Sequence, residues 1–472
     1  MTIRTRIEPA PSGSIHVGNA RTALFSWLYA KHHGGSFVLR IADTDAKRAT
    51  EENYQAVLDD MRWLGLEWDE GPDVGGDHGP YRQSERFDLY REWAERLVET
   101  GFAYRDYATE EDVDQERKRA QAEKRRPDHR AIASSREAEG GPFSIRFIVP
   151  AERSITYHDA VLGDVTTDLG RTPDFVILRS DGTPTYLLAV TVDDVAMEIS
   201  HIIRGNDLAA STPRQLLLRE AMGISDVPVF AHLPLIVDDK GKPLSKRWGD
   251  VSVRAYRDDG FLPEAMTNYL ALLGWSYDDK TNIFSIDELI ERFSLERVGR
   301  NPAAFDVDKL EWLNGHYIRS MTPEQLADVL VPFCEREGLP AGSDEGRAIL
   351  ARVSPLLVER MKRLTEAPPM IRFLFGEVTP DDKARKQLDG RSDYLDAAAD
   401  RLEGLDRWTT PAIEDALRGL QTERDLKPRQ AFQPLRAAVT GTLVSPPLFE
   451  SLEILGKDET VVRLRKAAVS AR

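Results

Sequence analysis

The sequence contains a single cysteine, Cys334, among its 472 residues. One thiol cannot form a disulfide within the chain, and it cannot supply the thiolates of a cysteine-based zinc site. The nine histidines form no cluster with the spacing of metal ligands. We therefore expect no zinc and no structural metal.

Long apolar runs are also missing. No stretch of 18 or more residues is apolar, 30% of the residues are charged and the net charge is −16, so we expect no membrane span. The first residues enter a strand-like run at once, without the charged and apolar regions of a signal peptide. These features predict a cytoplasmic protein, and its length predicts several domains and allows an enzyme.

Acidic residues outnumber basic ones, 79 to 63, which argues against a surface of general basic charge for nonspecific DNA binding. Two segments are locally basic: residues 116–130, with seven Lys or Arg against three acidic residues, and residues 463–472. Each segment is either a solvated helix face of mixed charge or a contact for nucleic acid. The sequence does not decide between the two.

Strand-like and helical segments alternate up to about residue 250. The strand-like runs are 36–41, 174–179, 199–205 and 228–237, and the helical stretches between them are 51–66, 86–101 and 212–223. Such alternation is typical of a parallel α/β sheet. From residue 254 onward nearly every periodic segment is helical, so we predict an α/β N-terminal half and an all-α C-terminal half.

Residues 8–25, EPAPSGSIHVGNARTALF, join a predicted strand (residues 2–7) to a predicted helix. Ala20, Leu24, Phe25 and Leu28 recur at the spacing of one helical face. A helix that begins after a Pro/Gly-rich loop at the carboxyl edge of a sheet presents unpaired N–H groups and a positive dipole end. This segment is either a simple connection or a phosphate site.

A second loop, residues 238–250 (DDKGKPLSKRWGD), carries Lys242, Ser245, Lys246 and Arg247 among Gly and Pro. It is either an ordinary basic surface loop or a cationic lid over an anion. Because it follows an α/β half that opens with a helix N-terminus, both loops can face one phosphate chain.

Two short motifs and several longer stretches resemble a known enzyme family. HVGN (residues 16–19) resembles the HIGH signature of class I aminoacyl-tRNA synthetases, and PLSKR (residues 243–247) resembles their KMSKS loop. Longer stretches such as 18–45, 202–215 and 309–319 are similar to bacterial glutamyl-tRNA synthetases, and the resemblance extends from end to end. Glutaminyl-tRNA synthetases usually end in β-barrels, and glutamyl-queuosine enzymes lack an anticodon domain.

The resemblance implies a Rossmann-like catalytic domain whose parallel sheet is interrupted by an α+β insertion. The segments expected from it are catalytic residues 1–85 and 183–250, inserted acceptor-stem-binding residues 86–182, stem-contact residues 251–322, and anticodon-binding residues 323–376 and 377–472. The partners expected are tRNA(Glu) and glutamate, with no membrane and no DNA. A monomer is also expected.

The resemblance also implies a reaction in which the α-carboxylate of glutamate attacks ATP, with Mg²⁺ on the phosphates. His16 and Lys246 would be catalytic. ATP would be bound by His16, Gly18, Asn19, Asp207, Ser245, Lys246 and Arg247. The HIGH-like motif comprises Pro9, Ala10, Pro11, Ser12, Gly13, His16, Val17, Gly18 and Asn19, and the KMSKS-like motif comprises Pro243, Leu244, Ser245, Lys246 and Arg247.

In the family, two arginines and a tyrosine hold the carboxylates of glutamate, and Arg6, Tyr186 and Arg204 match them. The residues expected around the substrate ammonium differ. The family usually reads RxAPSPTG and RIEDTD, whereas this chain has Glu8 and Ala10 in the first motif and Ala42 in the second. We predict that Glu8 and Ala10 point together into the pocket and that Glu8 replaces the carboxylate missing at Ala42.

Other departures affect neighbouring positions. Val190 stands where a polar residue is often found, RGNDL replaces RG[ED]DH with Asn206 and Leu208, and Pro243 stands where a lysine usually opens KMSKS. Three functions remain open: a glutamate–tRNA ligase, a nonligating tRNA-binding or regulatory paralogue, and a ligase for another acidic substrate. The charged Ser245–Arg247 segment favours the first, and the altered ammonium pocket favours the other two.

Overall fold

The computed structural model describes residues 2–45, 49–137, 141–244 and 251–471. The chain forms two compact units, one of Met1–Tyr256 with Met266–Val307 and one of Arg257–Ala265 with Asp308–Arg472. In the ranges described, no helix is both long and apolar enough to cross a membrane.

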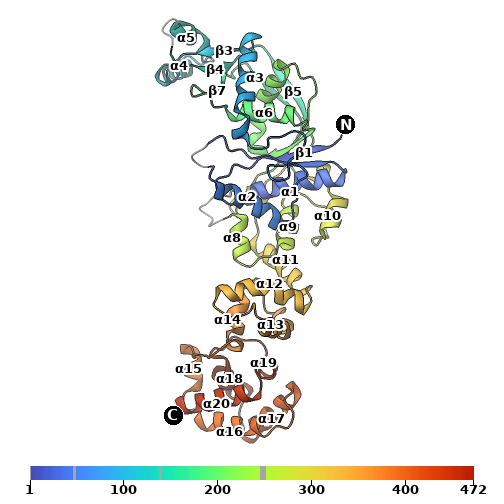
Figure 1. Cartoon of the computed structure of the whole chain (residues 1–472), viewed down its shortest axis with the longest axis vertical. Coiled ribbons are helices and arrows are strands. Elements are labelled where there is room, and N and C mark those ends of the chain that lie inside the picture. The colour runs from blue at the N-terminus through green and yellow to red at the C-terminus, as the bar shows by residue number, and fades with distance from the viewer. Residues whose placement is uncertain (1, 46–48, 138–140, 245–250, 472) are drawn as a thin grey trace. The chain divides into compact units, whose positions relative to one another are not determined.

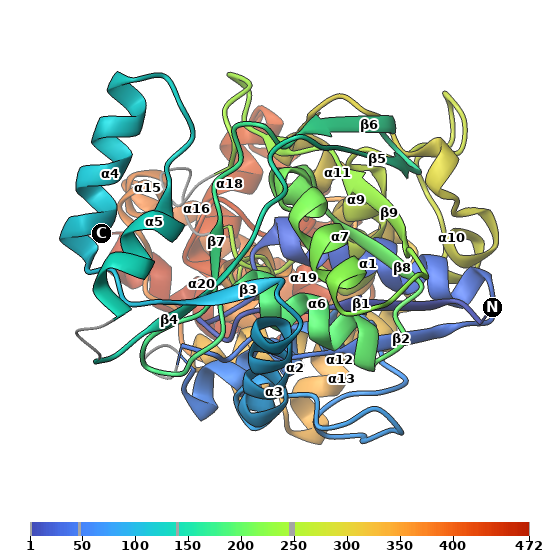
Figure 2. The ribbon, with the colours of Figure 1, turned by 90° about the horizontal axis from the view of Figure 1, so that it is seen from above.

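A mostly parallel sheet forms the centre of the first unit (Figures 1 and 2). Strand β1 (Arg4–Ile7) pairs in parallel with β2 (Ser36–Leu39), and β8 (His201–Gly205) with β9 (Val229–Leu233). The Ser200 N–H donates to the Arg4 carbonyl at 3.0 Å, which brings β8 beside β1. On the other side of β9, β5 (Ser154–Asp159) runs parallel to it and antiparallel to β6 (Gly163–Asp168). The predicted parallel α/β sheet is confirmed.

Helix α1 (Val17–His32) connects β1 to β2 and carries the apolar face that the sequence predicts. Ala20, Leu24, Phe25 and Leu28 are all fully buried, which withdraws their apolar surface from water and fixes the helix next to the sheet. The other helices in this part of the chain, apart from those of the inserted region, are α2 (Glu51–Trp63), α6 (Tyr186–Ala196), α7 (Thr212–Ala221), α8 (Val253–Asp258), α9 (Pro263–Leu272) and α10 (Ile286–Arg292).

The inserted region is an antiparallel sheet with helices. Its strands are β3 (Ala103–Asp106), β4 (Ser144–Phe147) and β7 (Phe175–Leu178), and its helices are α3 (Phe87–Glu99), α4 (Glu110–Ala122) and α5 (His129–Arg136). This mixed architecture confirms the predicted α+β insertion. Two cations of the basic segment 116–130 are used internally, since Arg125 pairs with Glu116 and Arg126 with Asp174.

The second unit is helical, as predicted. Its helices are α12 (Pro323–Arg336), α13 (Asp344–Leu357), α14 (Ala367–Ile371), α15 (Asp382–Leu388), α16 (Ser392–Glu403), α17 (Thr410–Glu423), α18 (Pro428–Thr440), α19 (Leu448–Leu455) and α20 (Lys457–Ser470), after α11 (Val307–Arg319). One apolar core is built mainly by α12–α14 and another by α15–α20. The only strand after residue 250 in the described ranges, β11 (Ala303–Ala304), lies in the first unit, where it pairs with β10 (Ile236–Val237). The finer division into six segments stays a prediction.

Candidate active site

The loop between β1 and α1 is fixed by hydrogen bonds at the end that leads into α1. His16 caps α1, and its Nδ1 accepts from the Gly18 N–H at 3.1 Å. In the neutral imidazole this leaves the ring proton on Nε2, the nitrogen that can donate. Ser14 Oγ donates to Asp60 Oδ2 at 2.6 Å, and the Ile15 N–H donates to the same oxygen. The first turn of α1 is therefore held in one orientation.

A cavity of about 470 Å³ opens at this helix N-terminus. It brings together most of the residues predicted from the sequence, which lie far apart along the chain. The predicted residues that line it are Arg6, Glu8, Pro9, His16, Gly18, Asn19, Tyr186, Arg204, Asp207, Pro243 and Leu244. Such a concave site with a few convergent polar groups is the usual form of a small-molecule site.

Some motif residues do not line this cavity. Ala10 is exposed and absent from the lining, although the sequence predicts that it points there with Glu8. The prediction is wrong because β1 ends at Ile7, so the alternation of a strand no longer holds beyond it. Pro11, Ser12, Gly13 and Val17 are also absent from the lining. Ser245, Lys246 and Arg247 fall outside the described ranges.

Beneath the cavity lies a network of buried charges. Arg6 Nε donates to Asp194 Oδ1 at 3.1 Å, and Arg40 Nη2 donates to the same oxygen at 2.9 Å. Arg40 also binds Glu8 Oε2. Burial alone lowers the pKa of Arg40, but the Glu8 and Asp194 carboxylates outweigh it and raise the pKa well above its ordinary value. These arginines stay charged.

Asp193 completes the network from the neighbouring position on α6. It accepts from Arg86 Nε at 2.7 Å, from Gln83 and from Tyr90, and Arg40 Nε lies 3.6 Å away. The three carboxylates Glu8, Asp193 and Asp194 are thus matched by the three guanidiniums Arg6, Arg40 and Arg86. A charge set balanced in this way meets the requirement for burying ions.

Arg204 is a buried guanidinium beside this network that forms no ion pair with a carboxylate among the described residues. It is 3% exposed, and it donates to neutral groups, from Nε to His232 Nε2 at 3.1 Å and from Nη2 to Thr212 Oγ1 at 2.8 Å. Burial lowers its pKa below the ordinary value. Within the described part of the chain its Nη1 has no hydrogen-bond partner. A buried guanidinium with an unused donor on a cavity favours an anionic ligand there.

The Glu8 side chain is 12% exposed and lines the cavity. Its Oε1 lies 3.5 Å from Arg6 Nη2 and 3.4 Å from Tyr186 Oη, so it faces the residues that the resemblance assigns to the substrate carboxylates. Ala42 lies beside the residue that follows Glu8, because the Ala42 N–H donates to the Pro9 carbonyl at 3.1 Å. Val190, by contrast, is fully buried in α6.

Several residues at this site are not predicted from the sequence. Arg21 lines the cavity, and its guanidinium donates to the carbonyls of Leu273, at 3.1 Å, and Pro234. Burial lowers the pKa of Arg21 to about 10. The charged residues Arg40, Asp193 and Asp194 stand within strongly apolar segments, and that contrast is the signal that points to them.

Within the described residues, no group of three or more His, Cys, Asp or Glu side chains is arranged to hold a metal ion.

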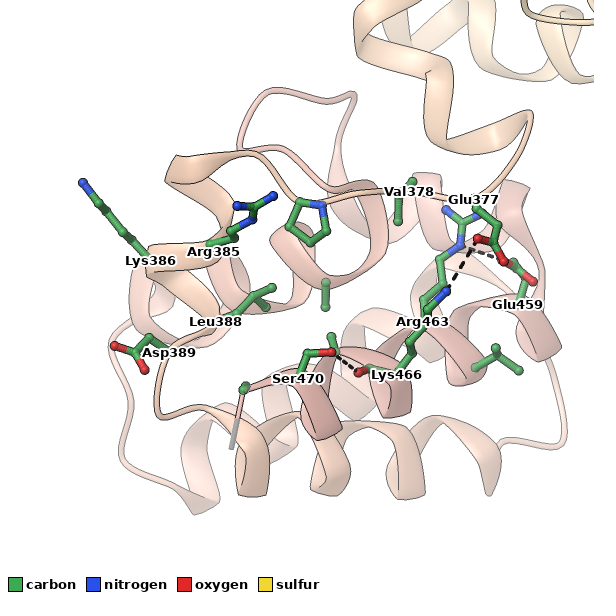
Figure 3. Close-up of a pocket in the computed structure, with 15 residues that line it drawn as sticks. Glu377, Val378, Arg385, Lys386, Leu388, Asp389, Glu459, Arg463, Lys466 and Ser470 are labelled. Carbon is green, nitrogen blue, oxygen red and sulfur yellow. Dashed lines mark hydrogen bonds and ion pairs between the residues drawn. The ribbon is translucent and has the colours of Figure 1, made fainter.

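A second cavity, of about 770 Å³, lies in the helical unit between α15, α18 and α20 (Figure 3). Several of its charged side chains form ion pairs with one another. Arg463 Nε donates to Glu459 Oε1 at 2.7 Å, and Lys466 Nζ lies 3.7 Å from Glu377 Oε2. Lys386 points away from these pairs in Figure 3. This cavity therefore has a lining of mixed charge in which several of the charges are paired.

Comparisons with known proteins agree with this geometry over the whole chain. Residues 2–312 match the family of class I tRNA synthetases (E and Q), catalytic domain, and residues 325–468 match an anticodon binding domain. A glutamate–tRNA ligase of Nocardioides sp. is 44% identical over 99% of this chain and 98% of its own length. One of Roseiflexus castenholzii is 45% identical over 99% and 96%.

Solved structures lead to the same family. A glutamate tRNA ligase from Elizabethkingia meningosepticum, in complex with its amino acid, superimposes with a TM-score of 0.85 at 32% identity over 100% of both chains. The glutamate–tRNA synthetase of Elizabethkingia anophelis gives 0.83 at 33% identity, with 99% of this chain and 100% of that chain covered. The helix N-terminus, the buried arginines and the full-length matches together show that this chain belongs to the class I tRNA synthetases of the E and Q family.

Proposed function

We propose that this protein attaches glutamate to tRNA(Glu) through a glutamyl-adenylate, with release of pyrophosphate and AMP. The observation that carries the proposal is the buried Arg204, which lines the cavity at the N-terminus of α1 and whose Nη1 has no hydrogen-bond partner among the described residues. The cavity thus offers the Arg204 guanidinium for an acidic amino acid and a helix N-terminus for phosphate.

In the first step, the α-carboxylate of glutamate attacks ATP and pyrophosphate leaves. Different residues of the cavity bind the two substrates. Arg204, Arg6 and Tyr186 hold carboxylate oxygens of the amino acid, while His16, Gly18, Asn19 and Asp207 bind ATP. His16 Nε2 donates to a phosphate oxygen because Nδ1 is occupied by the Gly18 N–H. Lys246, within the KMSKS-like segment Ser245–Arg247, neutralises charge on the departing pyrophosphate. Magnesium comes with ATP.

Gly18 supports the ATP assignment sterically. A Cβ at this position would stand 3.3 Å from His16 Nδ1, tighter than an ordinary contact. A side chain would also occupy the surface over the first turn of α1 that a nucleotide must approach. Glycine keeps both the capping hydrogen bond and that approach.

The ammonium of glutamate requires its own partner, and we assign Glu8. The Arg40 N–H donates to the Ile7 carbonyl at 3.0 Å and the Ala42 N–H to the Pro9 carbonyl, so the two segments run side by side. A carboxylate on residue 8 can therefore reach the region that a residue 42 side chain would reach. Because Arg40 also binds Glu8, the ammonium shares this carboxylate with it.

In the second step, the terminal 2′-hydroxyl of tRNA attacks the adenylate. The helical unit from about residue 323 reads the anticodon, where unstacked bases are recognised by side chains. The expected working state is a monomer in the cytoplasm, with no DNA partner.

ATP–pyrophosphate exchange tests the function directly. Purified full-length protein is assayed with glutamate, glutamine and aspartate, each with and without tRNA. Exchange that depends on glutamate supports the proposal. Exchange with aspartate alone identifies a ligase for another acidic substrate, and tRNA binding without any exchange identifies a nonligating paralogue; either result refutes it.

A further inference from the structure

A line of hydrogen bonds crosses three neighbouring strands behind the cavity. Arg204 on β8 and His232 on β9 are direct register partners, and Asp159 on β5 stands opposite Phe230 of β9. Asp159 Oδ2 lies 2.5 Å from His232 Nδ1, and His232 Nε2 lies 3.1 Å from Arg204 Nε. Figure 2 shows the three strands side by side. The sheet itself therefore aligns a carboxylate, an imidazole and a guanidinium.

The protonation states along this line follow from the partners. The Asp159 carboxylate can only accept, so it takes the Nδ1–H of His232 and leaves a lone pair on Nε2 for the Arg204 Nε–H. Burial lowers the pKa of His232, which is fully buried. Burial raises the pKa of Asp159, but hydrogen bonds from His232 and from the Leu162 N–H outweigh it, and the pKa falls below its ordinary value. The imidazole is neutral and the carboxylate ionised.

Other neighbours fix the remaining sides of the Arg204 guanidinium. Thr212 Oγ1 accepts from Nη2 at 2.8 Å. The guanidinium lies over the Phe230 ring at 5.6 Å from its centroid, and that ring stacks with the His232 imidazole at an interplanar angle of 3°. The plane and the rotation of the guanidinium are thus both set. Only Nη1 has no partner among the described residues, and Arg204 lines the cavity.

We propose that Asp159, His232 and Thr212 are positioning residues that aim Arg204 Nη1 at a carboxylate of the acidic amino acid substrate. None of the three lines the cavity, so they act through Arg204 alone. The inference rests on the proposed function, because it assumes that Arg204 binds the amino acid. Its physical basis is preorganisation: a guanidinium already oriented loses less freedom when it binds a carboxylate.

The test compares two substitutions at one position in the full-length protein. His232→Gln keeps an acceptor near the place of Nε2, whereas His232→Leu removes it. We expect His232→Leu to raise the KM for glutamate about 10-fold or more in ATP–pyrophosphate exchange with tRNA present, since hydrogen bonds to charged groups are among the strong ones. The KM for ATP should stay within about twofold. His232→Gln should recover most of the affinity for glutamate.

A second variant covers the case in which His232→Leu does not fold. Thr212→Val preserves the shape of the side chain and removes the acceptor for Nη2, so a rise of about 3-fold to 10-fold in the KM for glutamate is expected. His201→Gln is the matched control, because His201 is also buried, at 9% exposed, and stands on the same strand β8 as Arg204 but does not line the cavity. It should change neither KM.

The outcomes separate the inference from the function. If the wild-type protein does not activate glutamate, the proposed function fails, whatever the variants do. If it does, an unchanged KM for glutamate in both His232→Leu and Thr212→Val overturns the positioning role. A parallel loss for glutamate and ATP with a lowered melting temperature also overturns it, because that pattern is structural. The ¹⁵N spectrum of the His232 ring gives a readout independent of activity: a spectrum without the Nδ1–H tautomer contradicts the proposed alignment.

Discussion

Replacing Glu8 by alanine should remove most of the glutamate activation of this enzyme. The substitution takes away the carboxylate that we assign to the substrate ammonium, and Ala42 offers none in its place. The protein should still fold, since Arg40 keeps Asp194 at 2.9 Å and Asp193 at 3.6 Å after Glu8 is truncated. The expected loss is therefore in substrate binding rather than in stability.

The size of the effect follows from the burial of Glu8. Its side chain is only 12% exposed, so an ammonium 4 Å away would gain about 4 kcal/mol at an effective dielectric constant of about 20. Arg40 and Arg6 already share this carboxylate, which reduces the net gain. Removing one partner of a buried charge pair costs about 2 to 5 kcal/mol. We expect the lower end, about 2 kcal/mol, or a rise of about 30-fold in the KM for glutamate.

ATP–pyrophosphate exchange with tRNA present measures this change. The double variant Glu8→Ala with Ala42→Glu should recover a measurable part of the lost activity, because the two segments are adjacent. Glu70→Ala is the matched control. The Glu70 side chain is 14% exposed and pairs with Arg4 of β1 at 2.6 Å, but it does not line the cavity. The KM of the Glu70→Ala variant for glutamate should therefore match that of the wild type.

Two results would refute this reasoning. A normal KM and turnover in Glu8→Ala would mean that the ammonium is recognised by other groups. A lower KM would mean that the Glu8 carboxylate competes with the substrate for Arg6 and Tyr186, which it faces at 3.5 and 3.4 Å. The sign of the change thus distinguishes an ammonium acceptor from an internal competitor.

Further predictions concern other parts of the chain. Lys246→Ala should lower adenylate formation about 100-fold or more and leave tRNA affinity nearly unchanged; unchanged exchange would remove Lys246 from the mechanism. A chain ending near Phe375, before the core of α15–α20, should keep its KM for ATP and lose selectivity among tRNAs. If the truncated chain kept the selectivity of the full-length protein, α15–α20 would not be needed to read the anticodon. Burial lowers the pKa of His201 to about 4, so the imidazole binds a proton more readily in the unfolded chain than in the folded protein. Its contribution to the free energy of unfolding, about 3 kcal/mol, is therefore present above pH 6.5 and is lost as the pH falls toward 4. Urea melts of His201→Gln should show a weaker acid dependence than the wild type. Cys334 is fully buried and burial raises the pKa of its thiol to about 12, so thiol reagents should label it only on unfolding; rapid labelling of the native protein would contradict this burial.

The local elements follow from the sequence because their causes are local. The spacing of Ala20, Leu24, Phe25 and Leu28 predicts the buried face of α1, and short β-branched runs predict β2, β7, β8 and β9. The Pro/Gly-rich loop before a helix predicts an anion site at its start. The full-length family resemblance then supplies Arg6, Tyr186 and Arg204, which no periodicity identifies.

The tertiary structure decides which charges neutralise one another. Arg40 and Asp194 are 154 residues apart, and Asp159 and His232 are 73 apart, so no pattern along the chain pairs them. Only their pairing shows that Glu8, Asp193 and Asp194 are balanced by three arginines, whereas Arg204 donates to the neutral groups of His232 and Thr212. The sequence by itself determines where strands, helices and motifs begin, because short-range packing and backbone preferences set them. The electrostatics of the site depend on long-range contacts and burial, which exist only once the sheet has brought these strands together.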